Sequence, residues 1–291
     1  MRNLFVLVDD ETPARRLPMD QDVQKHVAAA LQRQAAKFLS DDVELIEFDG
    51  RYTPDENEVL IIRNFAIDPK VKAALAAPLT CETLDLRVDP DESLPKIKGV
   101  VSSPLKGEGD LFVQVFDRRQ VLSQHGLTLF HHGATYRRLA EPGLVLNSSI
   151  DAVVSGTDLY FRSYFLARRL FNLVAYFQEA TDEDVDEFAD AHVFHVEDKA
   201  ALLRNADSWV RRKIRFIKEA GILTQVTAKQ IEARANEFGI GVKTIEKSGK
   251  MRVVLPSSKA DFKMVLRVLD DDCFTGIMSG TRFVSNSKRK V

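Results

Sequence analysis

The sequence predicts an α+β fold with an α/β N-terminal segment, a central antiparallel sheet and a helical, basic C-terminal part. Strand-like and helical patterns alternate at first, short apolar runs broken by glycines follow, and amphipathic helical patterns fill the last third. Hydrophobic residues make up 45% of the 291 residues and charged residues 29%, which is typical of a chain with a buried core. We expect three parts, at residues 1–93, 94–180 and 181–291.

The first part alternates between the two periodicities. Strands are predicted at residues 4–8, 43–48 and 59–65. A helix is expected over residues 20–39, where apolar residues recur at helical spacing. Pro69 fits the first turn of a second helix, which we expect to end near residue 76, because proline tolerates the missing amide donor there.

The second part carries closely spaced short strands, which is typical of an antiparallel meander. They are predicted at residues 97–102, 111–116, 127–131, 135–139, 144–146, 150–154 and 159–161. Gly133 and Gly156 mark hairpin turns between them. Ser163 is expected to cap a helix that runs to residue 177, and the aromatic residues of that helix predict a core or dimer-interface position.

The third part is mainly helical. Thr227 and Gln230 form a capping-box pattern at the start of one helix, and two strand-like runs at residues 242–245 and 251–255 predict a hairpin after it. A helix at residues 207–221 precedes this pair, so the order resembles that of a winged helix, although the link of about seven residues is longer than usual. Ser257 or Ser258 is expected to cap a last helix through residue 269.

Composition favours a cytoplasmic protein. Two cysteines, Cys81 and Cys273, are too few for a disulfide framework or a zinc cage and fit a reducing compartment. No uncharged apolar stretch approaches the roughly 20 residues that cross a bilayer. The apolar run before Asp9 is too short for a signal peptide. We expect no cofactor.

Charge is distributed unevenly along the chain. Residues 1–197 hold 21 Lys and Arg against 33 Asp and Glu, whereas residues 198–291 hold 20 against 10. Such asymmetry indicates a polyanionic partner, with double-stranded DNA as our main hypothesis. The alternative is that the two sets of charges compensate each other within the molecule or a dimer.

The cations of the last third lie in three clusters that we expect to contact DNA phosphates. The first two recur at helical spacing on faces away from the apolar residues, and the third lies at the C-terminal end. The clusters are Arg211, Arg212, Arg215 and Lys218; Lys259, Lys263 and Arg267; and Lys288, Arg289 and Lys290.

Motifs for common catalytic chemistry are absent. The sequence has no nucleophile elbow, no phosphate-binding P-loop and no dinucleotide fingerprint. Asp270, Asp271 and Asp272 follow a predicted helix, where acids oppose the helix macrodipole. They leave open a metal-dependent nuclease with Asp261 and Lys263 nearby in sequence, or a loop whose acids pair with arginines.

A resemblance to a known family covers roughly residues 94–291. Its core patterns recur in order at residues 97–100, 127–133, 150–154 and 158–161, and Leu269-Asp270-Asp271-Asp272 precedes Phe274 and the tail at residues 285–290. In these features the chain resembles the KwaB-like family, the B subunit of the bacterial Kiwa anti-phage defence system. It departs from the family pattern at His131 and His132, where a polar or basic pair is typical.

The resemblance implies a dimeric cytoplasmic effector that binds DNA with little sequence preference. It also implies cooperation with a small membrane-embedded A subunit, which could recruit the protein to the inner membrane. It supplies no catalytic residues. A structural subunit whose basic third docks on an acidic protein surface remains the other alternative.

Overall fold

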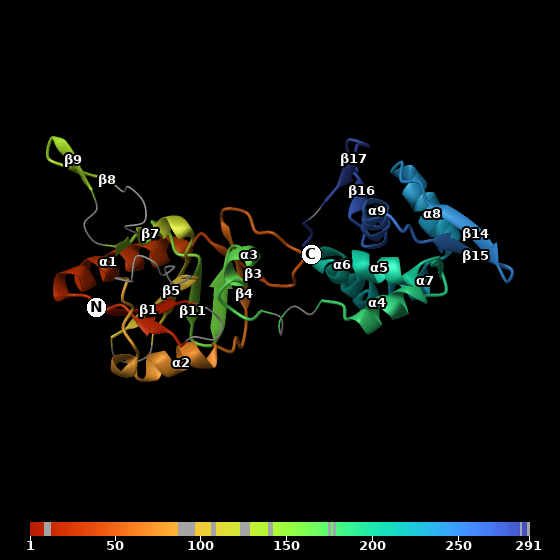
Figure 1. Ribbon diagram of the computed structural model, residues 1–291. Coiled ribbons are helices and arrows are strands. Elements are labelled where there is room, and N and C mark those ends of the chain that lie inside the picture. Colours follow the sequence, from red (N-terminus) through yellow and green to blue (C-terminus); the bar gives the residue numbers. More distant parts are fainter. Residues whose placement is uncertain are drawn as a thin grey trace. The chain divides into compact units, whose positions relative to one another are not determined.

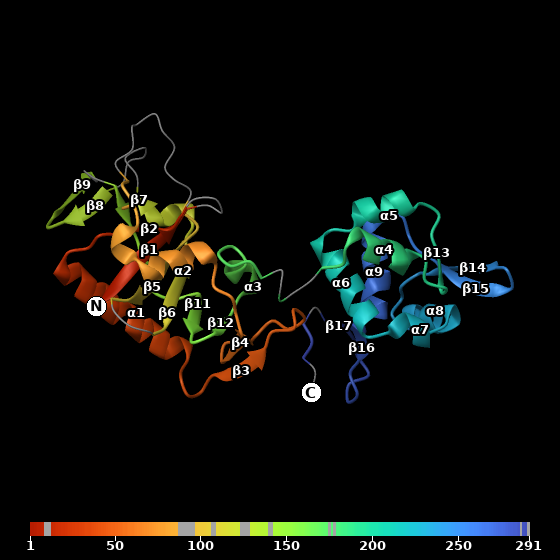
Figure 2. The same cartoon turned by 90° about the horizontal axis from the view of Figure 1, so that it is seen from below.

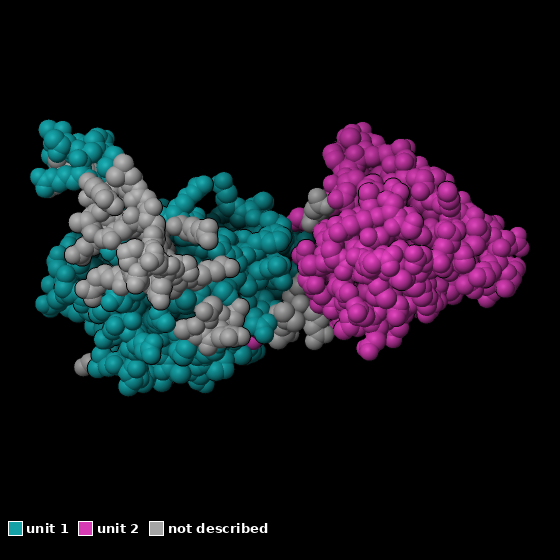
Figure 3. All heavy atoms as spheres, viewed as in Figure 1, with its two compact units in different colours: residues 1–173 teal, residues 174–291 magenta. Residues whose placement is uncertain are grey.

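The computed structural model describes residues 1–8, 13–86, 97–105, 109–122, 129–138, 142–173, 176, 179–285 and 287–289. The chain forms two compact units, Met1–Leu173 and Val174–Val291, called unit 1 and unit 2 below (Figures 1 and 3). Each unit contains both helices and strands, which confirms the predicted α+β fold.

Unit 1 is built on a sheet that has eight strands in the described residues, in the order β2-β1-β5-β6-β11-β12-β4-β3. The strands are β1 (Arg2–Leu7), β2 (Arg15–Arg16), β3 (Glu44–Glu47), β4 (Glu58–Ile62), β5 (Gly99–Pro104), β6 (Leu111–Val115), β11 (Ala152–Ser155) and β12 (Asp158–Phe161). Neighbours run antiparallel except β3 and β4, which are parallel.

Four of the seven strands predicted for the antiparallel meander form β5, β6, β11 and β12, which are neighbours in this sheet. The strands predicted at residues 127–131, 135–139 and 144–146 do not join it, because their described residues pair in two separate two-stranded sheets. Strands β1 and β4 come from the predicted first part and flank them. Residues on both sides of the boundary expected at residue 93 therefore share one set of backbone hydrogen bonds, and the division of the chain lies at residue 173 instead.

Helices cover both faces of the sheet because side chains alternate along each strand. Leu4 and Val6 share a core with α1 (Gln21–Phe38), while Phe5 packs with α2 (Pro69–Ala76) on the other face. Asp20 caps α1 through the amides of Asp22 and Val23.

Two small strand pairs complete the described unit, together with the 3₁₀ turns η1 (Pro78–Thr80) and η2 (Arg118–Gln120). These pairs are β7 (Val121–Leu122) with β10 (Gly143–Leu144), and β8 (Leu129–His132) with β9 (Thr135–Arg138).

The helix predicted from Ser163 is shorter than expected. Ser163 caps α3 (Tyr164–Ala167), and the described residues beyond Ala167 leave the helix. Tertiary contacts explain this, because Arg169 donates a hydrogen bond to the carbonyl oxygen of Phe116 at 2.6 Å and Phe171 packs edge-on against Phe65 at 5.2 Å. Four residues near the predicted end, 174, 175, 177 and 178, lie outside the described residues.

Unit 2 combines helices with two small sheets in the described residues, one of three strands and one of two (Figure 2). Its helices are α4 (Asp182–Ala189), α5 (Lys199–Asn205), α6 (Ser208–Glu219), α7 (Ile222–Gln225), α8 (Ala228–Glu237) and α9 (Lys259–Leu269). Its strands are β13 (Phe194–His195), β14 (Lys243–Lys247), β15 (Lys250–Val254), β16 (Cys273–Thr275) and β17 (Arg282–Val284). Strand β15 lies between β13, which is parallel to it, and β14, which is antiparallel.

Several local predictions for unit 2 are confirmed. The apolar face of α6 is fully buried through Val210, Ile214 and Ile217. Thr227 and Gln230 form the predicted capping box of α8. The predicted hairpin is β14–β15, and α7 fills the long link between α6 and α8. No helix within the described residues has the length and apolar composition needed to cross a membrane.

Candidate nucleic-acid interface

Two residues of the first predicted cluster, on α6, pair with acids of α4. Lys218 Nζ lies 2.5 Å from an Asp184 oxygen and 2.6 Å from a Glu187 oxygen. Arg211 pairs with Asp182 at 2.5 Å. Two of these three acids, Asp182 and Asp184, lie in the first turn of α4.

The other two residues of this cluster also have partners. Arg215 pairs with Glu219, one turn further along α6, at 2.7 Å. Arg212 donates from Nε to the carbonyl oxygen of Ser208 at 3.3 Å. The repulsion expected between stacked cations on α6 is therefore offset by neighbouring acids rather than left for an external anion.

The second predicted cluster, on α9, surrounds Asp207, the residue that caps α6. Lys259 and Lys263 lie 3.0 and 2.8 Å from its Oδ2, and Val210 donates its amide to Oδ1 at 3.0 Å. Burial alone would raise the pKa of Asp207, but these hydrogen bonds outweigh it and hold that pKa well below its usual range. Arg267 lies over the Trp209 ring at 5.8 Å from its centroid, beside Lys263 at 5.2 Å.

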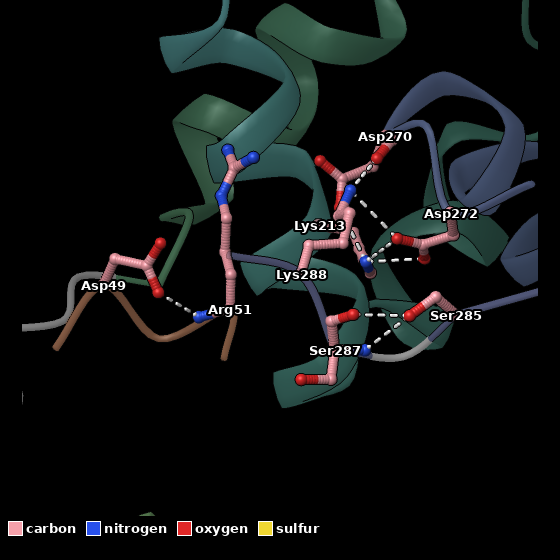
Figure 4. Close-up of polar contacts among 8 residues, drawn as sticks. All are labelled: Asp49, Arg51, Lys213, Asp270, Asp272, Ser285, Ser287 and Lys288. Carbon is pink, nitrogen blue, oxygen red and sulfur yellow. Dashed lines mark hydrogen bonds and ion pairs between the residues drawn. The ribbon is translucent and has the colours of Figure 1, made fainter. Parts of the chain in front are cut away.

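The third predicted cluster is divided. Lys288 enters a buried group with Asp270, Asp272 and Lys213, called the ion quartet below (Figure 4). Its Nζ lies 3.1 Å from an Asp270 oxygen and 3.0 Å from an Asp272 oxygen. Arg289 is exposed at the end of the described residues, and Lys290 lies outside them.

Lys213 belongs to none of the clusters predicted from the sequence, yet it pairs with both acids of the ion quartet. Its Nζ lies 2.6 Å from both Asp270 and Asp272, whose side chains are almost completely buried. The sequence does indicate that Lys213 is buried, because it lies three residues after Val210 and so shares the core-facing side of the helix with Val210 and Ile214. A charge in a core position needs a buried partner.

The acidic triplet ends α9 in a Schellman-type cap. The amide of Asp271 donates to the carbonyl oxygen of Val268, the amide of Asp272 donates to that of Arg267, and Asp271 takes a left-handed φ of 53°. This cap directs Asp270 and Asp272 toward Lys213, so their pairing partners are lysines rather than the expected arginines. Among the described residues, no group of three or more acidic, histidine or cysteine side chains is arranged to hold a metal ion.

The charge asymmetry changes when it is counted by structural unit. Residues 174–291 hold 20 Lys and Arg and 18 Asp and Glu, a formal net charge of +2. The acids between residues 179 and 197 belong to unit 2 and pair with several of its cations. Unit 2 as a whole therefore carries little net charge. A cationic surface on it depends on where its unpaired cations lie.

Some exposed cations of unit 2 pair with no acid of the described chain. They are Lys229 on α8, Lys243 and Lys247 on β14, Lys250 on β15 and Arg282 on β17. Four of them lie within residues 229–250, outside the three clusters predicted from the sequence to contact DNA.

No known family model, characterised protein or solved structure matches the chain.

Breaking the ion quartet should cost more free energy of unfolding than breaking a surface ion pair. We expect Lys213→Met to destabilise the protein by about 3 kcal/mol or more, because it leaves two buried carboxylates with Lys288 as their remaining lysine partner. Urea unfolding of Lys213→Met and of Arg215→Gln, a matched control that removes one surface pair on the same helix, checks this. Equal losses in the two variants would show that the ion quartet contributes no more than a surface pair.

The α4–α6 pair gives a pH signature. The hydrogen bond from Lys218 is the main cause that lowers the pKa of Asp184 from 3.8 to about 2. A lowered carboxyl pKa stabilises the fold above its unfolded value and loses that effect as pH falls through the folded value. Lys218→Met should therefore lower the free energy of unfolding by about 1 kcal/mol at neutral pH. The difference in free energy of unfolding between the variant and wild type should narrow between pH 3.8 and about 2. Thermal unfolding at a series of pH values measures this, and a constant difference down to pH 2 would contradict it.

Proposed function

We propose that unit 2 binds double-stranded DNA with little sequence preference. The observation that carries this proposal is the set of exposed, unpaired cations at residues 229–250, three of which lie on the hairpin β14–β15 itself. Unpaired lysines attract phosphates electrostatically and carry no information about the bases, so they favour binding that tolerates any sequence. The paired residues of α6 and α9 then serve mainly to hold unit 2 together.

The salt dependence of binding tests this directly. We expect the full chain to retard unrelated DNA duplexes of equal length equally, with affinity that falls steeply as salt rises. Each neutralised phosphate contributes about −0.9 to the slope of log affinity against log salt, so four contacts give a slope near −3.6. A competition with single-stranded DNA and with RNA of the same length identifies the preferred polymer. Affinity that does not change with salt would rule out a phosphate-directed contact.

We further propose that DNA binding serves anti-phage defence, as the resemblance to the KwaB-like family implies. In this role the protein is a cytoplasmic effector that works as a homodimer with a small membrane-embedded A subunit. The acid-rich unit 1, with 25 Asp and Glu against 21 Lys and Arg, is the better candidate for docking that subunit, because DNA repels its net negative charge and unit 2 then stays free for DNA.

A second copy would cover the exposed apolar residues Ile277 and Met278 of a homodimer. Light scattering would measure the resulting mass.

The cellular role can be checked by phage plaque counts. We expect protection only when the protein and a small membrane-embedded partner are expressed together, because the effector then reaches events at the envelope. Each gene expressed singly is the control. Full protection by this protein alone would remove the need for a partner, whereas the DNA-binding proposal would stand on its own measurement.

A further inference from the structure

The register of the hairpin β14–β15 separates two faces of different chemistry. Thr244, Glu246, Met251 and Val253 lie on one face, where Val253 is fully buried and Thr244 donates to Glu232 of α8 at 3.0 Å. The opposite face, called the outer face below, presents Lys243, Ile245 and Lys247 from β14 and Lys250, Arg252 and Val254 from β15. Four of these six residues are cations and none is acidic.

The neighbouring strand extends this face. His195 of β13 pairs in register with Val254 and so lies on the same side of the sheet. Arg252 donates to the carbonyl oxygen of Phe194 at a long 3.5 Å. No acidic side chain in the described residues forms an ion pair with the outer-face lysines, which are all exposed.

One cross-strand pair breaks a rule of sheet stability. Lys247 lies directly opposite Lys250, and like charges in this position destabilise a hairpin. The turn between them, Ser248-Gly249, has φ values of 55° and 72°, which is the two-residue turn with positive φ that fits a tight hairpin. The backbone thus places the two lysine side chains opposite each other at the tip, and an anion bound between their ammonium groups would relieve the repulsion.

We infer that the outer face of β14–β15 is the DNA-contacting surface, with Lys247 and Lys250 bracketing a backbone phosphate; this rests on the proposed function. A two-stranded ribbon fits the major groove of B-DNA, which is about 12 Å wide. An acidic protein is the weaker fit, because protein interfaces are built around aromatic anchors and are poor in lysine, whereas the outer face has no aromatic residue. Figure 2 shows the hairpin projecting from the helices of unit 2, where a polymer could reach it.

Reversing one charge of this pair separates DNA binding from stability. Lys247→Glu replaces two opposed ammonium groups with an ion pair, so the melting temperature should rise by about 1–4 °C. The same change should weaken binding to duplex DNA by about tenfold or more and reduce the salt slope by about one phosphate. A residue with a purely structural role would not raise stability and lower affinity together.

Two further variants complete the test. The double variant Lys247→Glu/Lys250→Glu again opposes like charges, so its melting temperature should return toward that of wild type while DNA binding stays lost. The control is Lys25→Glu, at an exposed position of α1 in unit 1, which changes the net charge by the same amount as Lys247→Glu. It should leave DNA affinity within about twofold of wild type.

The outcomes distinguish the two proposals. If wild type binds DNA and Lys247→Glu binds it equally well, the outer face is not the contact surface although the proposed function stands. If wild type retards neither DNA nor RNA at low salt, both proposals fail. Retention of polyglutamate but not DNA by wild type, lost in Lys247→Glu, would also overturn the inference and assign the outer face to an acidic protein.

Discussion

The ion quartet is the constraint on which unit 2 depends. Lys213 and Lys288 meet the buried carboxylates of Asp270 and Asp272, so the middle of α6, the C-terminal cap of α9 and the C-terminal segment share one set of contacts. Removing water from these charges costs several kcal/mol per ion, and only their mutual pairing offsets it. Lys288 and Ser285 are therefore anchored rather than free to follow a nucleic acid, because the amide of Ser285 also donates to the carbonyl oxygen of Asp272 at 2.8 Å. Ser285 and Ser287 hydrogen-bond to each other beside the ion quartet (Figure 4).

A second constraint follows from the position of α4. Its acids lie against α6 and hold Arg211 and Lys218, the residues that made α6 look like a DNA-binding surface. The interaction is mutual, because the same acids would repel a phosphate backbone that approached these two cations. Charge in unit 2 is therefore sorted by location: the α4–α6 side is neutralised, and residues 229–250 keep lysines without acidic partners.

Local elements could be predicted from sequence and non-local ones could not. The caps at Ser163 and Thr227 and the helix that begins at Pro69 depend on residues a few positions apart, and all are present. The shared sheet of unit 1, the early end of α3 and the partners of Lys213 depend on pairings far apart in sequence. Within the candidate site, helical spacing grouped the cations correctly by helix face. Whether each cation can contact a phosphate depends on which acids the fold places beside it, as Asp182 and Asp184 show for Arg211 and Lys218.

The lysines of β14 have a competing explanation, which the topology decides in part. Strand β14 lies at the edge of its sheet, and edge strands often carry lysine to prevent pairing with other chains. That explains Lys243 and Lys247. Strand β13 pairs with β15 only at Val253 and Val254, so edge protection extends to Lys250, which lies beyond the paired part of β15. Edge protection gives no reason, however, to oppose Lys247 with a second lysine, since an acid in its place would stabilise the hairpin. The opposed lysines at the hairpin tip are better explained by an anionic partner.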